Sequence, residues 1–470
     1  MKVLIVGAGI GGLSASALSS PPSPFASSKP TPSSLGARPL RLSPPPLSSA
    51  LVLASRPTAP ALYTLSRHPP RRTFPSAHSS TALIATQCAP PPGIRSASTL
   101  EGRNTAMAGL GQQWWLRRSE EGEGEEIEWG RKVVAVTELE AHQGVQIEYQ
   151  DGSKDVVDLV IGADGVRSRV RESMFHGKYP AEYNGVIGVG SFIPVALLPP
   201  KLKQGLLDKD SDDGVVMTFG TKGMFGYSLC TPRDVPNEYI QTGPILQWWC
   251  SYEAPEPSYT STRAKTTAEA DAVKQELLKS YGSWKSPRDE NNSDGVFKSI
   301  VELGCVSEEV KDTLTHHHTP VLMLPRYVVP RLLESYTTPT GRIILLGDAA
   351  HAMPPDGGQG ASCAAEDAVV YALLVSKLLS LRAAEPVSEM PESVLRDAAK
   401  GYNELRMERV GKVLDEAKNR VDNKKEISTL GRWFRDLMIR LMCSLPESLS
   451  DCWYAYDGEK VVNDYVAHNI

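Results

Sequence analysis

The segment from Gly341 to Asp367, GRIILLGDAAHAMPPDGGQGASCAAED, constrains the fold of this chain more than any other part of its sequence. Its apolar run, Ile343 to Leu346, has the length and β-branched character of a buried strand, and it ends at Gly347-Asp348. Ligands of α/β proteins bind at the carboxyl ends of such strands. The glycine-rich turn that follows opens a helix of small residues, so several backbone N–H groups can point at one spot. The segment therefore predicts a binding site for an electron-rich ligand.

Two further segments have the same form, an apolar strand that ends in a turn. At the amino terminus, Lys2 to Val6 runs into a GxGxxG sequence formed by Gly7, Gly9 and Gly12. Such glycines allow a tight turn, close approach to a pyrophosphate and close packing of a helix on the strand. Similar turns also occur as plain loops, but the position directly after a strand favours a dinucleotide site. In the middle of the chain, Asp158 to Arg171 reads DLVIGADGVRSRVR, and the alternative there is an ordinary Asp-Gly turn.

The three segments resemble, in the expected order, the fingerprints of the flavin-dependent aromatic hydroxylases, the para-hydroxybenzoate and salicylate hydroxylase class. The resemblance implies FAD as cofactor and NAD(P)H as co-substrate. It implies that Asp348 binds the ribityl chain, that the backbone of Gly358 to Ser362 lies along the isoalloxazine ring, and that Pro355 shapes the pocket beside the ring. Ser362 stands where many relatives have Asn, which leaves the backbone contacts intact. In the middle segment, Asp164 would serve the pyrophosphate region.

Family-like sequence also surrounds Arg118, which is followed by Ser-Glu and matches an arginine that reaches the flavin. A solvated basic pair is the alternative for this position. The acid- and glycine-rich run from Glu120 to Glu128 stands where the family has a leucine-bearing helix, which suggests that residues are missing. The full set of predicted cofactor-binding residues is Gly7, Gly9, Gly12, Arg118, Asp164, Gly165, Asp348, Gly358, Gln359, Gly360, Ala361 and Ser362.

Two ionisable side chains in the turn, His351 and Asp356, invite an acid–base interpretation. Neither matches a shared catalytic residue of the family, and His351 is expected to hold the turn. No side chain is therefore assigned as catalytic, because in this family the flavin supplies the chemistry while the protein orients it.

The segment between Ser19 and Leu100 departs most from the family. Residues 1–100 contain nine Lys or Arg and no Asp or Glu, and 17 of the 36 prolines lie within residues 19–100. So many prolines predict no packed element, and no strand ends in the acid that binds the adenosine ribose in the family. Three interpretations compete for residues 19–110: a disordered insert, a transit-like segment, or, as the preferred hypothesis, translated intron or out-of-frame sequence. A continuous in-frame transcript through this region would refute the third.

The predicted fold class is α/β, with a glutathione-reductase-like, Rossmann-type FAD domain interleaved with a β-rich substrate domain and a disordered insert near the N-terminus. The predicted boundaries are 1–18 for the start of the FAD domain, 19–110 for the insert, 111–182 for the FAD domain continued, 183–324 for the substrate domain, 325–430 for the FAD domain completed and 431–470 for a C-terminal helical tail.

The substrate domain is predicted from its short β-type runs. Strands are expected at Gly185–Ile193, Val215–Phe219, Met224–Cys230, Ile245–Tyr252 and Val321–Tyr327, with a helix at Thr267–Tyr281. Aromatic residues of these strands could line an apolar pocket, although sheet core is the favoured interpretation for any single one; they are Phe219, Phe225, Tyr227, Trp248 and Trp249. Downstream, helices are expected at Ala368–Leu379 and Val394–Leu430, the second as a solvated helix that supports the FAD domain.

Several classes of protein are disfavoured by the composition. Seven scattered cysteines without a CxxC pair argue against disulfide or zinc frameworks and favour a reducing, cytoplasmic compartment. The His316–His318 run has no acidic or Cys partner at ligand spacing, so no metal site is predicted.

No apolar run is long enough for a membrane span. The segment from Trp433 to Met442 could touch a membrane surface as an amphipathic helix, but a helix packed on the body is favoured. No nucleic-acid partner is expected.

The resemblance implies an FAD-dependent monooxygenase that uses NAD(P)H and O2. It would hydroxylate or epoxidise a small aromatic, polyketide-like or terpene-like substrate via a flavin C4a-hydroperoxide. One alternative is a catalytically defective homologue with an incomplete FAD site. Another is a flavin-dependent halogenase, which is disfavoured because the chain has no WxWxIP string.

FAD occupancy is the first testable expectation. Because no acid follows a second strand to bind the adenosine ribose, we expect the chain as written to purify with little or no FAD. The ratio of flavin absorbance to protein concentration measures this directly, and a full complement of flavin would contradict it.

Overall fold

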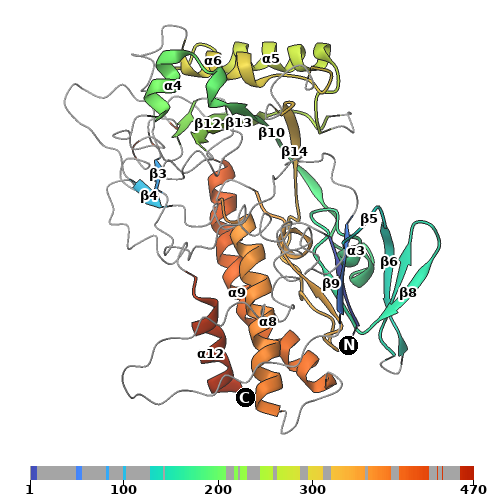
Figure 1. The fold of residues 1–470 in the computed structure, drawn as a ribbon. Coiled ribbons are helices and arrows are strands. Elements are labelled where there is room, and N and C mark those ends of the chain that lie inside the picture. Colours follow the sequence, from blue (N-terminus) through green and yellow to red (C-terminus); the bar gives the residue numbers. More distant parts are fainter. Residues whose placement is uncertain are drawn as a thin grey trace, which may run out of the picture.

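A computed structural model describes two sets of elements that pack around separate cores. The described residues are 2–7, 49–54, 81–83, 99–101, 127–140, 143–207, 216–220, 223–229, 244–257, 262–285, 295–310, 319–354, 358–382, 391–422, 431, 434, 437 and 456–470. One core lies between a parallel sheet and its helices, and the other between an antiparallel sheet and its helices. We call these the parallel-sheet domain and the antiparallel-sheet domain (Figure 1). The chain therefore has the predicted α/β fold.

The parallel-sheet domain is built on five strands in the order β15-β9-β1-β2-β5. Their bounds are Lys2–Val6 for β1, Ser49–Ala54 for β2, Ile127–Trp129 for β5, Leu159–Gly162 for β9 and Ile343–Leu345 for β15. The residues of β9 and β15 are buried throughout, as the continuous apolar runs of the sequence predict for strands covered on both faces. All four neighbouring pairs are parallel.

The register brings three strand ends to the same level. Gly162 of β9 pairs with Val6 of β1 on one side and with Leu345 of β15 on the other. The ladders continue one residue further, because the Ala163 N–H donates to the Val6 carbonyl at 2.8 Å and the Leu346 N–H donates to the Gly162 carbonyl at 2.9 Å. The three turns singled out in the sequence therefore begin side by side at one edge of the sheet.

The structure corrects the expectation that residues 19–110 contain no packed element. Residues 49–53 of β2 pair with all five residues of β1, and β3 (Thr81–Leu83) pairs with β4 (Thr99–Glu101). The physical reason is that prolines act locally: the six residues of β2 are SALVLA, without proline, and β1 offers them a complete row of backbone partners. Ser55-Arg56-Pro57 follows β2, so this second strand ends without an acid. The rest of residues 19–110 lies outside the described part of the chain.

The antiparallel-sheet domain has the strand order β11-β12-β13-β10-β14. Its strands are β10 (Glu182–Pro194), β11 (Val216–Phe219), β12 (Met224–Leu229), β13 (Ile245–Glu253) and β14 (Leu322–Val328), close to the ranges that the sequence predicts. Helices α4 (Pro200–Leu207), α5 (Thr267–Tyr281) and α6 (Val296–Gly304) cover one face, and a short 3-10 helix, Val195–Leu197, follows β10 (Figure 1). A capping box formed by Thr266 and Glu269 begins α5 at the residue that the sequence predicts.

The predicted aromatic cluster divides between the two faces of this sheet. Phe225, Tyr227 and Trp248 are buried in the core beneath the helices. Trp249 follows Trp248 in the strand, so its side chain lies on the opposite face. It is flanked in register by Gly190 and Gly226, and a Cβ on Gly226 would come within 2.6 Å of the indole ring. The glycines of both neighbouring strands thus leave room for this one indole.

Within the described residues, five helices and a small sheet complete the parallel-sheet domain. The helices are α3 (Arg169–Met174), α7 (Asp348–His351), α8 (Gly360–Arg382), α9 (Glu392–Asp422) and α12 (Gly458–Asn469). The small antiparallel sheet consists of β6 (Val133–Glu138), β7 (Val145–Tyr149) and β8 (Lys154–Val157). The long helices α8 and α9 pack against each other, and α12 packs against α8 (Figure 1).

Helix α9 is not the solvated helix that its composition predicts. One of its faces is buried, and the residues of that face recur every four positions; they are Val394, Ala398, Tyr402, Arg406 and Val410. The many charged residues of the sequence lie on the remaining faces and conceal this stripe. The helix does support the parallel-sheet domain, since the Tyr402 hydroxyl donates to the carbonyl of Leu345 at the end of β15 at 2.9 Å.

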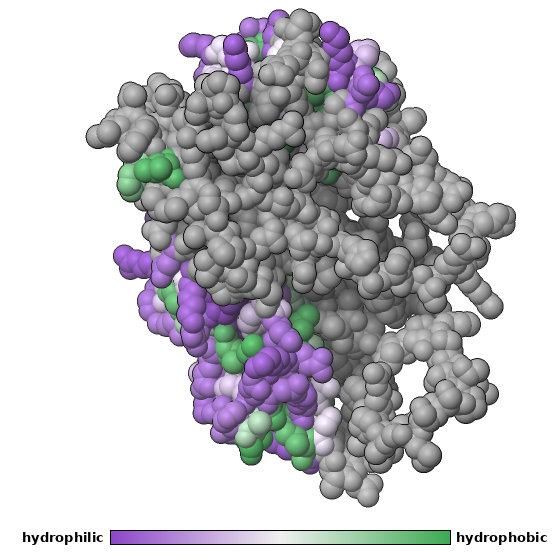
Figure 2. Space-filling view, turned by 90° about the vertical axis from the view of Figure 1, so that its left-hand side faces the viewer, coloured by the Kyte–Doolittle hydropathy of each residue, from purple (hydrophilic) through white to green (hydrophobic). Residues whose placement is uncertain are grey.

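The last helix is held against the body of the protein. Val462 of α12 is fully buried, and Tyr465 packs against the core of the parallel-sheet domain. The segment considered for membrane contact, Trp433 to Met442, lies mostly outside the described residues. Its two described residues, Phe434 and Leu437, are 60% and 46% exposed. On the face shown in Figure 2 the described surface is mostly hydrophilic with small, separate hydrophobic spots. Among the described residues, no helix is both long and apolar enough to cross a membrane.

Replacement of Gly7 by Ala tests the contact between two strand ends. Gly7 has φ +108°, and a Cβ there would lie 2.2 Å from the Ala163 carbonyl oxygen, so we expect the free energy of unfolding to fall by about 3 kcal/mol or more. Gly152→Ala is the matched control, because Gly152 also has a positive φ, +83°, but has no atom within 4 Å of a Cβ; its expected cost is about 1 kcal/mol. Equal losses in urea unfolding would contradict the close contact.

Candidate cofactor site

The candidate site lies where the turns after β1, β9 and β15 meet. Of the predicted residues in the first turn, Gly7 is described, and its conformation and contact with Ala163 both require glycine. Its role here is therefore close packing of the first turn against the second. Four residues with a predicted role, Gly9, Gly12, Arg118 and Pro355, lie outside the described part of the chain.

Asp348 lies at the carboxyl end of β15, where the sequence predicts a ligand-binding carboxylate. The preceding residue, Gly347, has φ +56°, and this sharp change of direction starts the short helix α7 at Asp348. The Asp348 side chain is exposed to solvent, and no described residue donates a hydrogen bond to its carboxylate. Partial removal of water by the surrounding protein raises the pKa of Asp348, while His351 and Arg171 act in the opposite direction. The carboxylate is thus available to a ligand.

The turn from Gly358 to Ser362 has the properties expected of a ligand-binding surface. A Cβ on Gly358 or on Gly360 would meet no described atom within 4 Å, so the backbone borders open space. Gln359 Oε1 and Ser362 Oγ are buried and have no hydrogen-bond partner within the described structure. Because buried polar atoms normally find a partner, these two atoms indicate a bound polar group. Helix α8 begins at Gly360 and adds backbone N–H groups that no earlier turn can satisfy.

These properties fit FAD. The isoalloxazine ring is flat and carries hydrogen-bonding edges, which suits a flat glycine backbone with orphaned side-chain oxygens beside it. The exposed carboxylate of Asp348 suits a ribityl hydroxyl. The residues that would hold the cofactor are Gly7, Gly165, Asp348, Gly358, Gln359, Gly360, Ala361 and Ser362.

Asp164 makes a set of hydrogen bonds within the protein, and its predicted role at the pyrophosphate stays a prediction. Its carboxylate accepts hydrogen bonds from Ser168 Oγ at 2.5 Å and from the N–H groups of Arg169 at 2.7 Å and Val170 at 3.2 Å. Burial raises the pKa of Asp164, and these hydrogen bonds oppose the rise. The side chain therefore holds the start of α3. The adjacent Gly165, with φ +79° and open space beside it, is the better placed of the two for backbone contact with a ligand.

Arg171 connects the second turn to the third, and its role could not be read from the sequence. Its buried guanidinium donates to the carbonyls of Val166 at 2.5 Å, Tyr179 at 3.1 Å and Ala349 at 2.9 Å. Burial lowers the pKa of Arg171, and Asp164 and Asp348 oppose this effect. The only sequence signal was its place in DGVRSRVR, which contains three arginines of indistinguishable character.

A buried carboxylate supports the third turn from behind. Asp367 Oδ2 lies 2.7 Å from His351 Nε2 and accepts the Gly347 N–H at 2.8 Å, and Oδ1 accepts Arg406 Nε at 2.7 Å. Burial alone would raise the pKa of Asp367, but His351, Arg406 and the Gly347 N–H together lower it to about 2. His351 thus holds the turn, as expected. The importance of Asp367 and Arg406 was not predicted.

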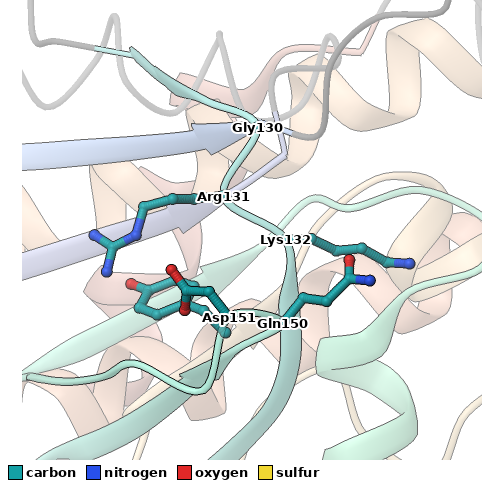
Figure 3. Close-up of a pocket in the computed structure, with 6 residues that line it drawn as sticks. Gly130, Arg131, Lys132, Gln150 and Asp151 are labelled. Carbon is teal, nitrogen blue, oxygen red and sulfur yellow. The ribbon is translucent and has the colours of Figure 1, made fainter.

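A surface recess of about 270 Å³ lies elsewhere, at the loop before β6 and the turn after β7 (Figure 3). Arg131 and Lys132 extend from it in opposite directions. The Arg131 guanidinium pairs with Glu128 at 2.9 Å and lies 3.9 Å from the centre of the Tyr149 ring. Because its charged wall is already paired and it contains no residue of the three turns, this recess is not a candidate site. Among the described residues no cluster of His, Cys, Asp or Glu suits a metal ion, and His316–His318 lie outside them.

Comparison with known proteins supports the same cofactor. Residues 331–387 match the family model described as FAD binding domain. Among curated relatives, the chloroplastic zeaxanthin epoxidase of Solanum lycopersicum is 28% identical over 61% of this chain, and FAD-dependent monooxygenase thnD of Trichoderma harzianum is 26% identical over 64%. The aurachin C monooxygenase/isomerase of Stigmatella aurantiaca is 27% identical over 64%. The chain spans 34%, 65% and 60% of these three relatives' own lengths, respectively.

Solved structures share the fold. A salicylate hydroxylase in complex with its substrate aligns over 98% of this chain and 97% of its own, with a TM-score of 0.57 and 18% identity. Klebsiella pneumoniae HpxO, complexed with FAD and uric acid, aligns over 99% of this chain and 95% of its own, with a TM-score of 0.52 and 16% identity. The chain therefore has a glutathione-reductase-like fold. The chain is similar to FAD-dependent monooxygenases, and the match of residues 331–387 to the FAD binding domain supports FAD as its cofactor.

Replacement of Arg171 by Met tests the connection between the second and third turns. The variant removes the guanidinium donor of three buried or part-buried carbonyls, so we expect the free energy of unfolding to fall by about 3 kcal/mol. Arg169→Met is the control, since the exposed Arg169 pairs with Glu172 and its loss should cost less than about 1 kcal/mol. Chemical denaturation of both variants measures the difference, and a similar small loss for each would show that Arg171 does not join the turns.

Proposed function

We propose that this protein is an FAD-dependent monooxygenase that uses NAD(P)H and O2 to oxygenate a small organic substrate. The observation that carries the proposal is the meeting of three turns at one sheet edge, of which the third contains the exposed Asp348 carboxylate and leads to the orphaned side-chain oxygens of Gln359 and Ser362. The curated relatives named as monooxygenases and as an epoxidase support the same reaction class.

Each described part of the site would have a distinct task. Bound FAD would supply the redox chemistry, which is hydride transfer from NAD(P)H and activation of O2. Asp348 would accept hydrogen bonds from ribityl hydroxyls, and the Gly358 to Ser362 backbone would bind one face and edge of the ring. The amino terminus of α8 would lie toward the pyrimidine edge, where the helix dipole favours negative charge on the reduced ring.

The uncovered face of the antiparallel sheet is proposed to bind the substrate. The helices α5 and α6 cover the face in which Trp248 is buried (Figure 1), and Trp249, the next residue of β13, lies on the face that these helices leave uncovered. Leu324 shares this face with Trp249 and is 47% exposed. The Trp249 indole, with Gly190 and Gly226 on the neighbouring strands, can stack on a planar ring or contact a conjugated apolar chain. We therefore propose an aromatic or polyene-like substrate that is hydroxylated or epoxidised.

The free, buried thiols of Cys250, Cys305 and Cys363 support a reducing, cytoplasmic compartment.

A catalytically defective homologue is the second candidate, and one observation favours it. Strand β2 occupies the position of the family's second strand but is followed by Ser55-Arg56-Pro57, without an acid for the adenosine ribose. Titration with FAD followed by NADPH oxidation in the presence of O2 separates the candidates. Turnover supports the monooxygenase, whereas FAD binding without NADPH oxidation supports the defective homologue.

Replacement of Gly360 by Val tests whether the open space at the turn is the FAD site. A Cβ there meets no described atom, so stability should change by less than about 1 kcal/mol, while a side chain in the ligand's place should weaken FAD binding by about tenfold or more. The matched control is Gly411→Val, because Gly411 is also a helical glycine without an atom near its Cβ. Fluorescence titration with added FAD measures both variants. Unchanged affinity in Gly360→Val would place the cofactor elsewhere.

A further inference from the structure

A buried ion pair lies directly behind the candidate cofactor turns. Asp367 and Arg406 are both fully buried and 39 residues apart in the sequence. We propose that Asp367 and Arg406 are positioning residues that hold the third turn in the arrangement FAD requires, and that the C-terminal helix is needed to keep this pair away from water. The inference rests on the proposed function, since it concerns the same site.

The Asp367 carboxylate joins three separate pieces of the site. It accepts the N–H of Gly347, the residue before Asp348, and so fixes the strand end that carries the predicted ribityl ligand. It lies against His351, and so fixes the other end of α7. Asp367 itself belongs to α8, which begins with the residues that border the predicted ring site. One side chain therefore determines the spacing between Asp348 and the start of α8.

Arg406 extends this support to α9. Its guanidinium donates to Asp367 Oδ1, to Glu366 Oε2 at 2.8 Å and to the Cys363 carbonyl at 3.2 Å. Cys363 directly follows Ser362, so this last hydrogen bond holds the first turn of α8 from below. Two acids and two bases meet here, because Arg409 also pairs with Glu366 at 3.3 Å. A buried charge is strongly unfavourable when its partner moves away, so the pair tolerates few alternative positions of the turn.

The C-terminal helix covers the outer side of this cluster. The Tyr456 ring lies 5.1 Å from the guanidinium carbon of Arg406 and 5.2 Å from that of Arg409. Tyr456 immediately precedes α12, which is anchored on α8 and by the buried Val462. Removal of the Tyr456 ring would admit water to the Asp367–Arg406 ion pair. The electrostatic attraction within the pair would become weaker, because water screens the charges.

Substitutions of the pair distinguish positioning from plain structural support. Asp367→Asn removes the fully buried charge that faces Arg406 Nε and leaves Glu366 as the described carboxylate partner of Arg406, so we expect the apoprotein to unfold at a lower denaturant concentration and FAD affinity to fall by about tenfold or more. The double variant Asp367→Asn/Arg406→Gln removes both charges and should recover much of the stability. If the pair positions the turn, the double variant still binds FAD about tenfold more weakly, with an altered visible absorbance and circular dichroism spectrum of the bound flavin.

The control and the second variant use the same part of the chain. Glu408→Gln/Lys412→Met removes an exposed pair of α9, 2.7 Å apart, and should leave FAD affinity and spectrum unchanged. Tyr456→Ala tests the covering ring without creating an unpaired buried charge, and we expect a loss of FAD affinity of about threefold or more.

The possible outcomes separate the two proposals. A wild-type chain that binds no added FAD overturns the proposed function and the inference with it. A wild-type chain that binds FAD, together with a stable double variant of normal affinity and normal flavin spectrum, overturns the positioning role alone. Unchanged affinity in Tyr456→Ala overturns the role of the C-terminal helix.

Discussion

Three parallel strands that end at one level are the constraint on which the rest of this molecule depends. Gly162 is paired with Val6 on one side and Leu345 on the other, so the turns that follow must share the same small space. Close packing there leaves no room for a Cβ on Gly7. The same geometry allows one arginine, Arg171, to reach carbonyls of the second and third turns together. Backbone groups of distant segments are thus brought within reach of a single extended ligand.

The side chains behind this edge separate support from ligand contact. Asp164, Arg171 and Asp367 are ionisable residues of the fingerprint segments, yet each is used to hold backbone in place. Asp348 alone among the described acids of these turns presents a carboxylate to solvent without a described donor. The charged side chains inside the protein therefore fix the position of the turns, and the surface that these turns offer to a ligand is mostly backbone. This arrangement suits a cofactor that carries the reactive chemistry and needs chiefly orientation.

The proline-rich amino-terminal region shows how an unfavourable composition can still contain an element of the fold. Six consecutive residues without proline, Ser49–Ala54, are sufficient to pair with β1, because an unpaired edge of a parallel sheet offers hydrogen bonds to any extended segment. What this strand lacks is the acidic residue at its end, as the sequence Ser55-Arg56-Pro57 makes plain. The parallel pairing of the first two strands is therefore present, whereas the acid that the family resemblance predicts after the second strand is absent from Ser55-Arg56-Pro57.

The sequence by itself determined the fold class and the main strands of both sheets and predicted candidate cofactor residues, because local patterns encode these features: apolar runs, glycine turns and an acid at a strand end. It also separated His351 from a catalytic role. Only the tertiary structure decided that Asp164 holds a helix, that Trp248 and Trp249 belong to opposite faces, and that Arg406 lies buried beneath the turn. These features depend on contacts between residues that are tens or hundreds of positions apart in the sequence. A buried arginine in a helix rich in charge has no distinguishing local pattern, so its partner, Asp367, is identified only when the two helices are packed together.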